Sequence, residues 1–282
     1  MKATIIGVNG AQYPLNNSAG MFLLRDTSGL WHPPIDLDTV TAVGRQGSVL
    51  TRVQVQERDV SLPVMVHADS QIEARDRLRT LLSATNPTVG DSILRIEYDD
   101  GSRRDLWGRV ADVAVVGGRG RATWQEAVIT WRAFDPYWRI GEVVREYAVA
   151  APDFFTDPDG FPLQLAGESI IASVMEENIG DADAWPVWML RGPGVPVLRN
   201  LTTDEVLQFE DLVLETGQEL IVNTEPGIKT IEVDGVSVYQ ELTLESRLWA
   251  LVPGPNEVSI DLVDGTSDSL VRLRYQARAL TP

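Results

Sequence analysis

Apolar and polar residues alternate along most of this chain, a period-2 pattern that predicts β-strands. In the first half, strands are expected at residues 4–9, Met21–Arg25, Thr39–Val43, Ile93–Tyr98, Leu106–Val116 and Thr123–Phe134. A long strand or hairpin is expected over Thr51–Val66, with a bulge near Glu57–Asp59.

In the second half, short apolar segments recur at intervals of about ten residues, the spacing typical of a β-sandwich. Strands are expected at Ser169–Glu177, Pro186–Arg191, Pro196–Asn200, Glu205–Phe209, Glu219–Asn223, Thr230–Val233, Val236–Tyr239, Arg247–Leu251, Asn256–Asp261 and Leu270–Ala277. No helix of useful length is predicted here, so the fold class is mostly β.

One segment, at about residues 70–84, has helical periodicity. Asp69 or Ser70 is a suitable N-cap, with Glu73 in the first turn, and the Asn86-Pro87 pair ends the helix. Its apolar stripe is formed by Ile72, Leu78, Leu81 and Leu82.

The strand Thr123–Phe134 stops abruptly at an aromatic junction. A proline lacks the N–H that a strand ladder needs, so the strand cannot continue through it. We therefore predict an N-terminal domain at 1–150, a Pro- and Asp-rich linker at 151–168 and a C-terminal β-sandwich at 169–282. The junction is expected to pack rather than bind a ligand, and it consists of Phe134, Asp135, Pro136, Tyr137 and Trp138.

Charge divides the chain in nearly the same place. Residues 1–150 contain 17 Lys+Arg and 18 Asp+Glu, whereas residues 151–282 contain 7 and 23. The acidic domain should therefore repel nucleic-acid phosphates. Two readings stay open: acidity keeps an exposed domain soluble, or it matches a basic partner or cations. The absence of cysteine excludes disulfides and thiol catalysis, and no apolar run is long enough to predict a signal peptide or membrane insertion.

Candidate chemistry is sparse, and we expect no enzyme, cofactor or metal site. His67, Asp69 and Ser70 are the residue types of a hydrolase triad, but such near neighbours cannot converge in space. The glycine run at 117–121 joins two predicted strands, so a hairpin turn is favoured over a phosphate loop. The three aspartates of the linker lack the calcium-loop pattern, which favours a loop without metal: Asp153, Asp157 and Asp159.

Three tryptophans of the second half are weighed as glycan-binding candidates, Trp185, Trp188 and Trp249. An exposed row of such rings could stack on sugars. Core packing is the favoured alternative, because tryptophan supplies much buried area.

Several motifs in order resemble the distal tail protein (Dit) family of long-tailed, siphovirus-type phages. Trp131–Tyr137 resembles the family's F-x-A/C-x-D-P-Y/F junction, and Asn178–Pro186 resembles its N-x-G-x-x-x-x-x-P segment. Asn200–Thr203 with Glu219–Thr224 resembles the N-x-T-T/G and L-x-I-D-T strands, although Asn223 replaces the aspartate. Leu251–Asn256 is similar to the L-x-P-G-x-N turn.

The resemblance implies a structural virion protein of the tail tip, or baseplate, without catalytic residues. Its N-terminal domain, split-barrel or β-sandwich-like, would form a hexameric ring, and its C-terminal domain would be a galectin-like or carbohydrate-module-like sandwich facing outward. Implied partners are the tail tube protein, the tail-tip hub, tape-measure-associated proteins and receptor-binding proteins used in host adsorption. Such a minor tail protein would be assembled in the host cytoplasm. The alternative is a carbohydrate-binding module that recognises host glycans.

Overall fold

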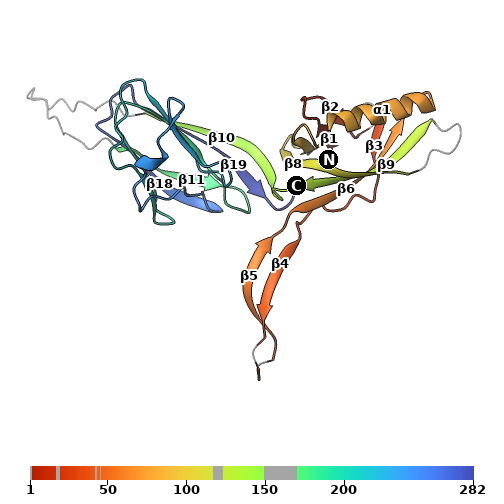
Figure 1. Cartoon of the computed structure of the whole chain (residues 1–282), viewed down its shortest axis with the longest axis horizontal. Coiled ribbons are helices and arrows are strands. Elements are labelled where there is room, and N and C mark those ends of the chain that lie inside the picture. The colour runs from red at the N-terminus through yellow and green to blue at the C-terminus, as the bar shows by residue number, and fades with distance from the viewer. Residues whose placement is uncertain (1, 17–19, 42, 45, 117–122, 149–169) are drawn as a thin grey trace, which may run out of the picture. The chain divides into compact units, whose positions relative to one another are not determined.

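A computed structural model of the chain describes residues 2–16, 20–41, 43–44, 46–116, 123–148 and 170–282 (Figure 1). The chain forms two compact units. The first comprises Met1–Ile140 together with Ala279–Pro282, and the second comprises Gly141–Arg278. Both are built mainly of antiparallel strands, so the predicted mostly-β fold class is confirmed.

The first unit contains two sheets that share the long strand β8. One runs in the order β2-β1-β7-β8-β10, and the other joins β3, β6, β9 and β8. The strands are β1 (Lys2–Ile6), β2 (Gln12–Pro14), β3 (Met21–Leu23), β4 (Ile35–Val40), β5 (Val49–Val55), β6 (Arg58–His67), β7 (Ser92–Glu97), β8 (Arg103–Val116), β9 (Trp124–Ala133) and β10 (Trp138–Ala148). The predicted turn at 117–121 lies outside the described residues.

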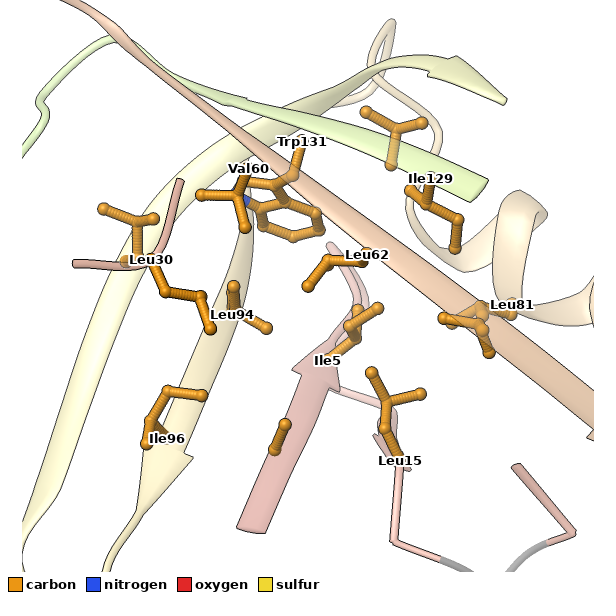
Figure 2. Close-up of a cluster of buried hydrophobic side chains, with 14 of the residues drawn as sticks. Ile5, Leu15, Leu30, Val60, Leu62, Leu81, Leu94, Ile96, Ile129 and Trp131 are labelled. Atoms are coloured by element: carbon orange, nitrogen blue, oxygen red, sulfur yellow. The ribbon is translucent and has the colours of Figure 1, made fainter. Parts of the chain in front are cut away.

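The core of the first unit is formed mainly by inward residues of its strands, together with Leu81 of the helix and the loop residues Leu15 and Leu30 (Figure 2). β6 shows the alternation well, since every second residue from Arg58 to Val66 is buried. The Trp131 ring of β9 is fully buried among them. Gly108 of β8 lies against it, and a Cβ there would overlap both the indole nitrogen and the Arg132 carbonyl. Glycine is therefore required at this position by packing.

The predicted helix is confirmed as α1 (Gln71–Ala84). The Ser70 side chain caps it, with its Oγ accepting a hydrogen bond from the Glu73 backbone N–H at 3.2 Å. The predicted apolar stripe is wrong at Ile72, which is 66% exposed. The helix instead buries Ala74, Leu78, Leu81 and Ala84, because a small residue fits where the first turn meets the sheet.

Thr51–Val66 is not one strand or one hairpin. β5 ends at Val55 and pairs with β4, whereas β6 begins at Arg58 and pairs with β3 and β9. The break near Glu57 that was expected to be a bulge is therefore a change of partner strand. Across it the apolar positions shift from odd numbers (Val53, Val55) to even numbers (Val60, Leu62). A bulge produces the same shift, so the sequence does not distinguish the two.

The second unit consists of two sheets and a second core. The sheet orders are β17-β16-β15-β12-β19-β10 and β11-β18-β13-β14. The strands are β11 (Ile170–Asn178), β12 (Val187–Arg191), β13 (Val195–Asn200), β14 (Glu205–Gln208), β15 (Glu219–Asn223), β16 (Thr230–Val233), β17 (Val236–Ser237), β18 (Gly254–Val263) and β19 (Leu270–Ala279), with a short 3-10 turn η1 (Tyr239–Glu241).

One predicted strand of this unit is wrong. Arg247–Leu251 forms no ladder, and Leu251 makes only an isolated bridge to Ala184. This segment is nevertheless partly buried, because Trp249 and Leu251 belong to the second core. The apolar residues of Arg247–Leu251 therefore indicate burial of the segment and not pairing with another strand.

The chain passes between the units twice, after Ile140 and before Ala279. The sequence placed the end of the first domain at residue 150, and the linker expected at 151–168 lies outside the described residues. Counted over the two units, charge separates fully: the first has 16 Lys+Arg and 16 Asp+Glu, and the second has 8 and 25. All of the net charge of −17 therefore belongs to the second unit.

Candidate assembly surface

The hairpin formed by β4 and β5 pairs only with itself among the described strands, and Figure 1 shows it as a two-stranded arm. Its ladder runs from Ile35–Val55 at the base to Val40–Val49 near the turn, with an irregularity after Asp38. All six residues of β4 and six of the seven residues of β5 are exposed. The hairpin therefore contributes no side chain to the first core.

The two faces of the hairpin differ in chemistry. Successive side chains of a strand point to opposite faces, and paired residues share a face. One face carries Leu37 opposite Val53, which are 58% and 55% exposed. The other carries Asp36 opposite Gln54 and Asp38 opposite Arg52, and near the turn it ends in the apolar pair Val40 and Val49. Ile35 and Val55 extend the apolar face at the base.

This apolar face has the properties of an unfilled interface. An isolated two-stranded hairpin is at best marginally stable in water, and contiguous exposed apolar side chains mark surfaces that contact a partner. The charged and amide side chains of the polar face can remain in contact with water. The arrangement can bury the apolar side chains of Ile35, Leu37, Leu50, Val53 and Val55 against another protein surface.

The predicted aromatic junction lies between β9 and β10, so the strand stops where the proline predicted. Pro136 and Trp138 are buried, and Asp135 and Tyr137 are half-buried. Phe134 differs, because 61% of its surface is exposed. Asp135 pairs with Arg139 at 3.6 Å. The chain does not leave the first unit at this stop, since that unit extends to Ile140.

Two of the three glycan-binding candidates are buried in the second core. Trp188 and Trp249 are 0% and 2% exposed and pack edge to face, with ring centroids 5.4 Å apart. Neither ring offers a face to a sugar, which removes both as stacking candidates. Only Trp185 of the three is partly exposed.

The residues considered for hydrolysis have structural contacts. Ser70 caps α1, and the carbonyl of His67 accepts a hydrogen bond from Arg77 Nη1 at 3.0 Å. In the described part of the chain, no three His, Cys, Asp or Glu side chains are grouped so that they could hold a metal ion. The same residues include no helix long and apolar enough to cross a membrane.

Among the described acidic residues of the second unit, Glu176 of β11 is the most buried, at 5% exposure. The Tyr147 hydroxyl of β10 donates to its Oε1, and the Tyr275 hydroxyl of β19 lies 3.2 Å from its Oε2. Two phenols therefore satisfy a charge that burial would otherwise make costly. Burial, aided by the negative Glu176, raises the pKa of Tyr275 to about 12 and also raises that of Tyr147.

A pH dependence of stability follows from Tyr275. Between pH 10 and about 12 the unfolded chain loses the phenol proton while the folded chain retains it, so stability falls as pH rises. The free energy of unfolding should decrease by about 1 kcal/mol per pH unit more in the native sequence than in Tyr275→Phe. Urea denaturation from pH 9 to 12 measures this difference. Tyr239→Phe, at an exposed ring, is the control, and an equal effect there would contradict the assignment.

Sequence reasoning missed two features of the first unit. The alternation Ile35-Asp36-Leu37-Asp38 is a strand signal, but the surrounding turn formers obscured it. Arg58 is fully buried at the start of β6, and the sequence offers no sign of this because arginine is usually exposed.

The fold is that of a two-unit, mostly β protein whose β4–β5 hairpin exposes an apolar face. Residues 8–99 match the family model of the phage tail protein RIFT-related domain. Among solved structures, the SPP1 Dit protein (gp 19.1), described as a paradigm of hub adsorption apparatus in Gram-positive infecting phages, has a TM-score of 0.69 and 14% identity over 98% of each chain.

A chain of the phage P2 baseplate, in its activated conformation with Ca, has a TM-score of 0.57 and 12% identity over 100% of this chain and 99% of that one. The same baseplate with Sr gives the same values. No curated protein matches the sequence. The resemblance to the distal tail protein family is thereby confirmed: the chain carries a phage tail domain at 8–99 and has the Dit fold throughout.

Proposed function

We propose that this phage tail protein forms a closed ring, hexameric as in the family it resembles, at the tip of the tail. The ring joins the tail tube to the hub and to tape-measure-associated proteins, and it supports the proteins that adsorb to the host. The observation that carries the proposal is the exposed apolar face of the β4–β5 hairpin. The role is structural rather than enzymatic, and assembly would take place in the host cytoplasm.

The hairpin supports a ring because its apolar face can contact a different surface on a neighbouring copy of the chain. If its apolar face packs on a different surface of the next copy, the interface is heterologous, and repetition of such a contact closes a ring when the rotation allows it. Packing against the next copy also buries the apolar side chains of the hairpin and stabilises the hairpin itself. A symmetric pair of hairpins would instead produce a dimer.

Charge supports the same arrangement. The first unit has no net charge, so copies of it can approach one another without net repulsion. The second unit carries the whole excess of acid, and copies of it are best kept at the periphery of an assembly. The glycan-binding alternative is not preferred, because Trp188 and Trp249 are buried.

Native mass spectrometry and negative-stain microscopy of the purified full chain test the proposal. We expect a mass about six times that of the 31.1 kDa chain, and rings in the micrographs. A folded protein that stays monomeric at high concentration, without rings, would refute it. A ring of another number would retain the assembly role and change only the stoichiometry.

A further inference from the structure

Arg58 is the first residue of β6, and none of its surface is exposed. Arginine is almost never fully buried without partners that accept its hydrogen bonds. Here Nη1 donates to the Leu30 carbonyl at 2.7 Å, and Nη2 donates to the Leu280 carbonyl at 2.6 Å. The second acceptor lies 222 residues further along the chain, in the last four residues.

The turn after β9 completes the cradle of this guanidinium. Its Cζ lies 5.9 Å from the Trp138 ring centroid, a cation–π geometry. The Trp138 indole N–H donates to the same Leu30 carbonyl at 3.0 Å. Burial lowers the pKa of Arg58 to about 10, and the negative charge of Asp135 opposes that effect. The guanidinium is therefore charged at neutral pH, where its hydrogen bonds to carbonyls are strongest.

The C-terminal segment Ala279–Pro282 lies at the site formed by Arg58 and Trp138. Ala279 is buried with the first core, and Leu280 follows it. Trp138 lies just before Ile140, where the chain leaves the first unit, and Leu280 lies just after the chain returns to it at Ala279. One side chain thus joins the two places where the chain crosses between the units.

We propose that Arg58 and Trp138 form a latch for the C-terminal segment Ala279–Pro282. When the latch is closed, Ala279–Pro282 is held on the first unit. When it is open, this segment is released from the first unit. The junction that the sequence singled out at 134–138 therefore holds the end of the chain. This inference does not depend on ring formation.

Hydrogen exchange on the full chain tests the latch with Arg58→Met, which keeps the length of the side chain and removes its charge and donors. We expect the amides of the C-terminal peptide to exchange on the order of tenfold faster, while amides of β8 and β9 keep their rates. Arg132→Met, a partly exposed arginine of the same unit, is the matched control and should leave the C-terminal peptide unchanged. Unchanged C-terminal exchange in folded Arg58→Met, or equal acceleration of β8 and β9, would overturn the proposal.

A double-mutant cycle gives a second reading. Deletion of residues 280–282 removes the acceptor, so adding Arg58→Met to this deletion should cost less stability than Arg58→Met costs alone. Strictly additive losses would show that the two sites are independent and would overturn the latch. If Arg58→Met does not fold, Arg58→Lys takes its place in the same cycle.

Discussion

Replacing Leu37 by Glu together with Val53 by Lys should convert the proposed ring into folded monomers. The two residues are register partners on the apolar face of the β4–β5 hairpin. The new side chains can form a cross-strand ion pair, which preserves the hairpin while making its face polar. An interface that must bury this face then has to desolvate two charges, so the change in mass by native mass spectrometry should be complete.

The opposite face provides a matched control. Asp36 and Gln54 are also register partners, one residue away in each strand. Asp36→Glu with Gln54→Lys places the same two charged residue types on the polar face and should leave the assembly intact. Loss of assembly in both variants would indicate damage to the hairpin rather than to one face. Persistence of the full mass in Leu37→Glu/Val53→Lys would show that the apolar face is not part of the interface.

This test also distinguishes the ring from other uses of the hairpin. If the purified protein is a monomer and the apolar face instead contacts a different tail protein, the two variants will have equal masses and will differ only in binding that protein. If copies of the chain contact one another, the difference appears with no other protein present. The measured mass therefore reports the partner as well as the surface.

The elements that the sequence predicts well are those for which local pattern and tertiary pairing agree. Ser70 and Glu73 predict the start of α1 because a cap is a local interaction. In the second half nine of the ten expected strands are confirmed, because each is a short apolar segment bounded by turn residues, whatever strand it pairs with. Pro136 likewise predicts the end of β9, since proline acts on the backbone itself.

The predictions that are wrong concern long-range partners of strands and side chains, which the local sequence pattern does not encode. The one-residue phase shift between β5 and β6 is what a bulge would produce, yet the two strands join different sheets, because the partner strand is decided by packing far along the chain. Arg58 shows the same limit most clearly. Its guanidinium donates a hydrogen bond to the Leu280 carbonyl, 222 residues further along the chain, which no window of neighbouring residues contains. The exposed apolar face of the hairpin was missed because apolar alternation is ordinarily taken as evidence of a core.

The second large effect is expected from Trp188→Ala, which should destabilise the second unit by about 3–5 kcal/mol. Trp188 lies on β12 between β15 and β19, and its ring is fully buried against Trp249. Truncation removes the apolar area of the ring and leaves a cavity that the two flanking strands cannot fill without leaving their ladders. It also removes the edge-to-face contact, which adds to the loss.

Urea denaturation of the full chain, with hydrogen exchange of β12 and β19 to identify the second unit, measures this effect. Trp185→Ala is the control three residues earlier, and because its ring is only partly buried the expected loss is about 1 kcal/mol or less. The pair of variants also separates packing from recognition. If Trp188 acted at a surface site, its truncation would leave the free energy of unfolding nearly unchanged, as for Trp185. A large loss at Trp188 alone would assign that ring to the core, and a glycan-binding role in this region would then have to depend on Trp185.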